Sequence, residues 1–168
     1  HISILEGIYV TDLLHVAGRV NGALGFELAG GRELIIHAGA AILATGGHTH
    51  IYRRSTSRRG ENSGDGMALA FNAGAALADM ELVQFHPSGM VWPPELEGTL
   101  VTEAVRGEGG RLFNCLGERF MRRYDAERLE LSTRDRVALA NYQEINAGRG
   151  TEHDGVWLDI SHLSPQTI

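Results

Sequence analysis

The stretch from residue 85 to residue 135 constrains this chain more than any other. It places histidine, threonine, glutamate and arginine among glycines, in the segments His86-Pro87-Ser88-Gly89, Thr102-Glu103-Ala104-Val105-Arg106-Gly107-Glu108-Gly109-Gly110 and Thr133-Arg134-Asp135. Buried strands and helices do not need so many polar residues between glycines. A site that holds a small dianion and moves one proton does need imidazole, hydroxyl and guanidinium donors, with a carboxylate beside an arginine. The stretch therefore predicts such a site.

Length and composition allow one or two globular domains. The chain has 168 residues, of which 43% are hydrophobic and 22 are glycine, which is enough for a core with many turns. The formal net charge of -6 argues against a nucleic-acid partner. Basic residues cluster at Arg53-Arg54 and Arg58-Arg59, and we interpret both pairs as parts of a solvated loop. No apolar run approaches the ~18–20 residues of a membrane span, so no direct span is expected.

The single cysteine, Cys115, excludes an internal disulfide and a cysteine-ligated metal site, and we predict no metal. We expect Cys115 to pack as a small apolar side chain or to lie in a turn, which suits a reducing compartment. The chain opens on His1, with no initiator methionine or signal peptide. We therefore expect it to be an internal fragment of a longer protein.

The first part of the chain predicts a β-meander over residues 7–44, because short apolar runs alternate with turns at Ala17-Gly18 and Gly30-Gly31. Residues 40–44 are apolar on both faces, as in a strand inside a covered sheet. The turn Thr45-Gly46-Gly47 follows, where backbone can approach a ligand closely. A plain strand-to-loop turn is the alternative.

A helix is predicted over residues 67–73, ended by Gly74. The segment Asn62-Ser63-Gly64-Asp65-Gly66 leads into it, and free backbone N–H groups at a helix start favour polar or anionic partners. The alternative is that Asp65 only caps its own helix.

The second part predicts a strand over residues 82–85 and a short helix over 102–106, in which Thr102, Glu103 and Arg106 share one side. The proline-rich loop 91–94 does not suit a sheet interior. A hairpin would join residues 112–113 to 119–121, and a strand would cover 156–160.

The strongest helix prediction is residues 134–147, ended by Gly148. Ser132 would cap it, with Asp135 three residues later as an approximate capping box. Arg134 then lies in the first turn, which is the wrong end of the helix dipole for a cation. This placement suggests a use other than helix stability, and a surface ion pair with Asp135 or Glu130 is the alternative.

Together these segments resemble the flavoprotein subunit of succinate dehydrogenase and fumarate reductase, in the FAD-dependent oxidoreductase 2 family, and more distantly L-aspartate oxidase. The resemblance runs from Leu43-Ala44-Thr45-Gly46-Gly47 to Val156-Trp157-Leu158-Asp159-Ile160. It implies an α+β fold. Residues 1–80 would be the C-terminal portion of a Rossmann-like FAD-binding domain, and residues 81–168 would be most of a mobile capping domain that closes over substrate.

The resemblance also implies an activity, in which succinate and fumarate interconvert by hydride transfer at FAD and proton transfer on the opposite face of the substrate. By position, His86 and Thr102 would donate to a substrate carboxylate. Arg134 would exchange the proton with the substrate carbon, and Glu103 and Arg106 would relay that proton to solvent. An arginine normally keeps its proton, with a pKa above ~12. Arg134 would therefore act by polarising the dicarboxylate and meeting a very basic carbon centre.

For the cofactor, the resemblance implies FAD contacts from two glycine-rich segments, formed by Ala44, Thr45, Gly46, Gly47, Gly64, Asp65 and Gly66. The Gly-x-Gly-x-x-Gly turn that cradles the ADP half of FAD is absent from this sequence. The histidine that carries covalent flavin in membrane-bound members is absent too, as is the second carboxylate clamp. We therefore expect the parent protein to be the enzyme, and the chain alone to be inactive.

The resemblance implies partner proteins as well. Membrane anchors and an iron–sulfur subunit would hold the parent on the cytoplasmic face of the cell membrane, in electron transport and the tricarboxylic acid cycle. Two alternatives stay open. L-aspartate oxidase would make iminoaspartate for NAD biosynthesis, although Gly110 and the loop 90–94 look more like the succinate dehydrogenase side. The other alternative is a non-catalytic, glycine-rich interaction domain.

Overall fold

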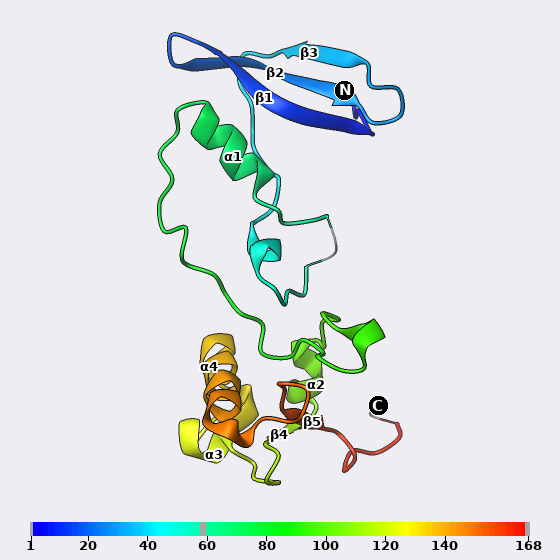
Figure 1. Ribbon diagram of the computed structural model, residues 1–168, viewed down its shortest axis with the longest axis vertical. Helices are drawn as coiled ribbons and strands as arrows, with labels where there is room; N and C mark the ends of the chain where they lie inside the picture. The colour runs from blue at the N-terminus through cyan, green and yellow to red at the C-terminus, as the bar shows by residue number, and fades with distance from the viewer. Residues whose placement is uncertain (1, 58–59, 167–168) are drawn as a thin grey trace. The chain divides into compact units, whose positions relative to one another are not determined.

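The computed structural model describes residues 2–57 and 60–166 (Figure 1). The described chain forms two compact units, one made of residues 2–51 and 60–82 and the other of residues 52–57 and 83–166. Helices and small antiparallel sheets occur in the same chain, so the architecture is α+β as expected. The predicted basic loop is only partly described: Arg53 is exposed, Arg54 pairs with Glu97, and Arg58-Arg59 lie outside the described residues.

The first unit contains the predicted β-meander. Strands β1 (Ile8–Val16), β2 (Arg19–Glu27) and β3 (Glu33–His37) form a three-stranded antiparallel sheet in the order β1-β2-β3. Ala17 and Gly18 have φ values of 48° and 75° and make the turn that sets Val16 opposite Arg19. The predicted turn at Gly30-Gly31 connects β2 to β3. This prediction is confirmed because the signals for a meander are local.

Two predicted strands do not form. Residues 40–44 and 82–85 have no strand pairing in the described part of the chain. Ile42 is 93% exposed and Leu82 is 71% exposed. An apolar segment becomes a strand only when a neighbouring strand takes its backbone hydrogen bonds, and none of the described residues does so here. Apolar composition predicts these strands, and the described residues provide no strand to pair with them.

Helix α1 (Asp65–Asn72) confirms the first predicted helix. Its N-cap is Gly64, with φ of 87° and no side-chain cap, so Asp65 does not cap the helix but is its first residue. At the other end the Gly74 N–H donates to the Phe71 carbonyl at 2.9 Å and the Ala75 N–H donates to the Ala70 carbonyl at 3.0 Å. This pair of bonds is a Schellman ending, which a glycine with positive φ permits.

The second unit is built from short elements. Helices α2 (Glu103–Gly107), α3 (Met121–Tyr124) and α4 (Arg134–Glu144) accompany the two-stranded antiparallel sheet of β4 (Arg111–Phe113) and β5 (Trp157–Asp159). Short helical turns complete the chain: η1 (Thr49–Ile51) in the first unit, and η2 (Pro94–Leu96), η3 (Leu129–Leu131) and the π-type turn η4 (Ile145–Arg149) in the second. The predicted helix over 102–106 and strand over 156–160 are therefore present, with slightly different bounds.

The predicted hairpin over residues 112–121 is wrong in its second arm. β4 pairs with β5, which places Arg111 opposite Asp159, while Met121 begins α3. Phe120 and Met121 are fully buried and join Leu112, Val137 and Ala140 in the core of the unit. Burial against α4 outweighs hairpin pairing because the two large side chains gain more by leaving water. The turn between the arms does form, and the exposed Cys115 lies in it.

Helix α4 begins at Arg134 as predicted, but the capping box is wrong. The N-cap is Thr133, without a side-chain cap, and the Ser132 Oγ donates instead to Asp125 Oδ2 at 2.7 Å. The regular helix ends at Glu144, and Gly148 in the following turn has φ of 74°, as a helix-ending glycine requires. The buried residues Val137, Ala140, Asn141 and Glu144 follow helical spacing and turn one face of α4 towards the core.

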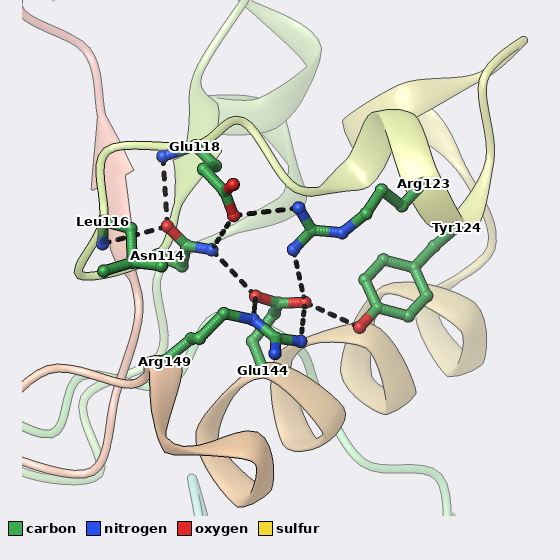
Figure 2. Close-up of polar contacts among 7 residues, drawn as sticks. All are labelled: Asn114, Leu116, Glu118, Arg123, Tyr124, Glu144 and Arg149. Carbon is green, nitrogen blue, oxygen red and sulfur yellow. Dashed lines mark hydrogen bonds and ion pairs between the residues drawn. The ribbon is translucent and has the colours of Figure 1, made fainter.

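A buried carboxylate ties α4 to its neighbours (Figure 2). Glu144 accepts hydrogen bonds from Arg149 Nε at 2.8 Å, Tyr124 Oη at 2.7 Å, and Asn114 Nδ2 and Arg123 Nη2 at 2.9 Å each. The hydrogen bonds from Arg149, and then those from the other donors, hold the pKa of Glu144 far below its usual value despite burial. The cluster joins α3, α4, η4 and the turn after β4.

Candidate active site

A short antiparallel bridge brings the His86 loop beside the chain that leads into α2. Gly89 pairs with Leu100, the Met90 N–H donates to the Thr99 carbonyl at 2.9 Å, and the Val101 N–H donates to the Ser88 carbonyl at 2.8 Å. Thr102 follows at the N-cap of α2, and its side chain makes no capping hydrogen bond. Its exposed hydroxyl is therefore not used by the helix.

The structure joins the three residues predicted to be catalytic. Arg134 Nε donates to Glu103 Oε2 at 2.8 Å, and Arg106 Nη2 lies 4.0 Å from the same oxygen. Arg134 therefore pairs with Glu103 and not with Asp135 or Glu130. The hydrogen bond from Arg134, followed by the charges of Arg134 and Arg106, lowers the pKa of Glu103 and keeps it ionised. The result is a carboxylate between two guanidinium groups.

Arg106 and Arg134 differ in exposure. Arg106 is 2% exposed, whereas the side chains of Arg134 and Glu103 are about half exposed. Arg106 Nη1 donates to the Glu130 carbonyl at 2.5 Å, but its Nε and Nη2 make no hydrogen bond among the described residues. Burial is the main reason that the pKa of Arg106 is lowered. Buried donors of this kind usually have partners, so these atoms are suited to an anion or to water.

The His86 ring accepts a hydrogen bond from its own loop. Its Nδ1 accepts a hydrogen bond from the Ser88 N–H at 3.2 Å, so in the neutral ring the proton is on Nε2. Burial, followed by the positive charges of Arg134 and Arg106, lowers the pKa of His86. Arg134 and Arg106 thus act electrostatically on both His86 and Glu103.

Sequence reasoning missed residues that support this site. Arg134 Nη1 lies 3.4 Å from Gln84 Oε1, and Asn141 Nδ2 donates to the Pro87 carbonyl at 2.7 Å. Asn141 thus connects the helix that begins at Arg134 to the loop that carries His86. Its polar side chain next to Val137 and Ala140 on the buried side of α4 was the signal that could have found it. Nothing local in the sequence marks Gln84.

In the first unit the two glycine-rich segments meet. The Gly64 N–H donates to the Gly47 carbonyl at 3.1 Å, and the Gly47 N–H donates to Asn62 Oδ1 at 2.9 Å. A Cβ atom added to Gly66 would lie 1.8 Å from Thr45 Oγ1, so no larger residue fits there. Ala44, Thr45 and Gly46 are exposed beside this contact, as is Asp65, whose Oδ2 lies 3.4 Å from Tyr9 Oη.

Neither a metal site nor a membrane span is found in the residues that the structure describes. No group of three or more histidine, cysteine, aspartate or glutamate side chains there could hold a metal ion. Within the same residues no helix combines the length and the apolar character that a membrane crossing requires.

Comparison with known proteins identifies the family. Residues 1–168 match the FAD binding domain family, and the chain belongs to it. Flavoprotein subunits of succinate dehydrogenase and fumarate reductase are among its relatives. The chain is 53% identical over 167 residues to one subunit of the fumarate reductase (CoM/CoB) of Methanothermobacter marburgensis, covering 99% of this chain and 30% of that protein. The chain thus spans less than a third of this relative.

Two further comparisons bear on fold and activity. The chain is 42% identical over 154 residues to L-aspartate oxidase 2 of Ralstonia nicotianae, covering 90% of this chain and 27% of that protein. Its fold matches a solved variant of the E. coli quinol fumarate reductase with a TM-score of 0.85 and 35% identity, covering 95% of this chain and 29% of that one. The fold of this part of a fumarate reductase is therefore present.

The family indicates that FAD is the cofactor, and the residues of the first unit fit it. The first N–H groups of α1 have no partner inside the helix, and the glycines beside them let a ligand approach the backbone. The exposed segment from Ala44 to Gly46 lies next to them. These features suit the acceptor-rich surface of a flavin nucleotide.

Proposed function

We propose that the chain is part of the flavoprotein subunit of an enzyme that interconverts succinate and fumarate. The observation that carries the proposal is the position of Glu103 Oε2, 2.8 Å from Arg134 Nε and 4.0 Å from Arg106 Nη2. A carboxylate between two guanidinium groups, one buried and one half exposed, can pass a proton from one to the other.

In fumarate reduction one alkene carbon takes a hydride and the other takes a proton, which gives succinate. The reduced form of bound FAD would supply the hydride, and the oxidised form would accept it in the reverse direction, with the iron–sulfur partner proposed below exchanging the two electrons. Arg134 would donate the proton and regain one through Glu103 and Arg106. Because an arginine normally holds its proton, the transfer requires the strongly basic carbon that hydride addition creates. Succinate oxidation would run the same proton path in reverse.

His86 and Thr102 would bind a substrate carboxylate. The neutral His86 has its Nε2–H free to donate, because the Ser88 N–H occupies Nδ1. The Thr102 hydroxyl is not used as a helix cap. The positive charges of Arg134 and Arg106 would add attraction for a dianion. All of these residues belong to the second unit.

The first unit would contact the cofactor. We assign FAD contact to Ala44, Thr45, Gly46, Gly47, Gly64, Asp65 and Gly66, because the structure brings the two segments together and leaves Ala44, Thr45, Gly46 and Asp65 exposed. The unit made of residues 2–51 and 60–82 would then belong to the FAD-binding domain, and most of the remaining chain to the capping domain.

The names of the relatives describe subunits, which supports partner proteins for this chain too. We propose an iron–sulfur subunit that exchanges electrons with the flavin, and membrane anchors that hold the complex at the cytoplasmic face of the membrane. Two similar proteins are named for different electron partners, CoM/CoB in one and quinol in the other. The proposal therefore concerns the dicarboxylate chemistry and assigns the choice of electron partner to the other subunits.

The test is an activity profile of the complete flavoprotein, after its FAD content has been measured. Fumarate reduction by a reduced dye, succinate oxidation by an oxidised dye and L-aspartate oxidation by oxygen are assayed on the same preparation. Fumarate or succinate turnover without aspartate turnover is the expected result. Aspartate turnover alone would assign the chain to L-aspartate oxidase. A protein that retains FAD and turns over none of the three would favour a non-catalytic domain.

A further inference from the structure

A second ion pair lies next to Arg106, and the proposed chemistry does not use it. Glu130 is 2% exposed, and its carboxylate accepts two hydrogen bonds from Arg119, from Nε to Oε1 at 2.9 Å and from Nη2 to Oε2 at 2.6 Å. The Leu112 N–H donates to Glu130 Oε1 at 3.0 Å. The side chain of Glu130 is therefore held from two sides, by a planar guanidinium and by the backbone of β4.

The backbone carbonyl of Glu130 has a different partner. It accepts the hydrogen bond from Arg106 Nη1 at 2.5 Å. Glu130 is the middle residue of the turn η3, and that turn is closed by bonds from the Leu131 and Ser132 N–H groups to the carbonyls of Arg128 and Leu129. One residue thus contacts Arg119 with its side chain and Arg106 with its backbone.

This bond orients the Arg106 guanidinium. Nη1 is its hydrogen-bonding atom, since Nε and Nη2 make no hydrogen bond among the described residues. With Nη1 held, Nη2 lies 4.0 Å from Glu103 Oε2. An arginine side chain has several rotatable bonds, so a shift of the Glu130 carbonyl would turn Nη2 away from Glu103.

We propose that the Arg119–Glu130 ion pair positions Arg106 for proton transfer with Glu103, by fixing the Glu130 carbonyl. The inference rests on the proposed proton relay. Arg119 and Glu130 act through Arg106, so they are positioning residues. The charge state agrees with this role: burial alone would raise the pKa of Glu130, but the hydrogen bonds from Arg119 and Leu112 outweigh it and the pKa is lowered.

The chain contains a matched control. Glu144 is also a buried glutamate held by arginines, Arg149 and Arg123. Its hydrogen bonds connect α3, α4, η4 and the turn after β4, and none of them is to Arg106. A substitution there perturbs a buried ion pair without touching the carbonyl that holds Arg106.

The experiment is a double-mutant cycle in the complete flavoprotein, with kcat and KM for fumarate measured across pH per bound flavin. Glu130→Gln and Arg119→Lys are each made in the parent and in an Arg106→Gln background, and Glu144→Gln is the control. We expect Glu130→Gln to lower kcat about tenfold or more, with KM within about twofold and a changed pH profile. Arg119→Lys keeps the charge but loses the planar fork, and its effect should be smaller.

The test of the inference is whether the effect of Glu130→Gln on kcat depends on the presence of Arg106. In the Arg106→Gln background, Glu130→Gln should lower kcat by less than about twofold, because the residue that it positions is already gone. Glu144→Gln should lower the unfolding midpoint and leave kcat per flavin within about twofold. A full loss from Glu130→Gln in the Arg106→Gln background would overturn the inference.

If Glu130→Gln does not retain flavin, Arg119→Lys decides by the same cycle. A loss confined to the Arg106 parent supports positioning, and an equal loss in both backgrounds contradicts it. Failure of the proposed function looks different, because the parent flavoprotein itself would then not turn over fumarate. An Arg106→Gln variant with the parent rate would contradict the proton relay, and the positioning role would fail with it. A slow Arg106→Gln with an unchanged Glu130→Gln would overturn the positioning role alone.

Discussion

Arg134 Nε lies 2.8 Å from Glu103 Oε2, although 31 positions separate the two residues along the chain. Arg134 is the first residue of α4, where the helix dipole disfavours a cation. The Glu103 carboxylate offsets that cost. The ion pair therefore explains how an arginine is kept at an unfavourable position. About half of the Arg134 side chain stays exposed to solvent while its Nε is bonded to the carboxylate.

Loss of Arg134 should nearly abolish turnover. In the complete flavoprotein we expect Arg134→Gln and Arg134→Lys to retain flavin and bind substrate but to lose activity, because both the proton donor and its electrostatic stabilisation are removed. Each effect is worth about two to four powers of ten in rate, and lysine lacks the planar fork. Steady-state fumarate reduction across pH is the measurement. Arg106→Gln should be less severe, with a steeper pH dependence. An Arg134→Gln enzyme with a tenth of the parent rate would show that another residue donates the proton.

His86→Ala and Thr102→Ala should weaken substrate binding more than they reduce kcat. Each removes one donor to a carboxylate, worth about 1.5–3 kcal/mol, so KM for fumarate should rise about 10-fold to 150-fold. Thr99→Ala is the control, since Thr99 is exposed and uses its backbone in the bridge to Met90. Parent-like KM values in both variants would rule out the assigned contacts.

Asn141→Leu should displace the His86 loop from α4. The variant loses the hydrogen bond from Asn141 Nδ2 to the Pro87 carbonyl and leaves that carbonyl without this donor, at a cost of about 1–3 kcal/mol in unfolding free energy. KM for fumarate should also rise, because the loop that carries His86 is no longer fixed to the helix that carries Arg134. Gln143→Leu on the exposed side of the same helix should change neither quantity. If Asn141→Leu lowers stability and leaves KM unchanged, the bond is structural only.

The Glu144 cluster should make the protein sensitive to acid. The pKa of Glu144 is lowered in the folded protein, first by Arg149, so its stabilisation is complete above the usual glutamate pKa of about 4.3. The stabilisation decreases as pH falls below that value towards the folded pKa.

Thermal unfolding of Glu144→Gln between pH 3 and pH 7 measures this effect. The variant should be less stable by about 3–5 kcal/mol at pH 7, since it breaks a buried ion pair, and it should depend less on pH below about 4.3. Glu95→Gln, at an exposed position, should behave as the parent does. Equal pH slopes in parent and Glu144→Gln would mean that other carboxyl groups govern acid unfolding.

The 168-residue chain by itself should bind FAD weakly or not at all. Its sequence lacks the glycine-rich turn that cradles the ADP half of the cofactor, and Ala44, Thr45 and Gly46 are exposed. Gel filtration of the chain after incubation with FAD, with absorbance recorded in the flavin region, is the measurement. A protein peak that stays yellow would contradict this expectation.

Features with local signals followed from the sequence alone. The predictions of the meander, α1, α2 and α4 rest on glycine turns and other signals within a few residues, and these elements form close to the predicted bounds, α4 without its predicted capping box. The residue types of the site, and the spacing that places Glu103 and Arg106 on one side of a helix, can also be read from a few neighbouring residues. The resemblance that names the chemistry depends on such short motifs.

Tertiary structure decided the rest, because the groups involved meet from distant positions. No strand pairs with residues 40–44 or 82–85 in the part of the chain that the structure describes, and β4 pairs with β5 instead of folding back as a hairpin. Arg134 donates a hydrogen bond to Glu103 and not to an acidic residue near it in the sequence. The Glu130 carbonyl accepts a hydrogen bond from Arg106, which lies 24 positions away in the sequence. A backbone carbonyl is present in every residue, so no sequence pattern marks the one that will orient a buried arginine. The packing of η3 against α2 determines which carbonyl accepts the hydrogen bond from Arg106.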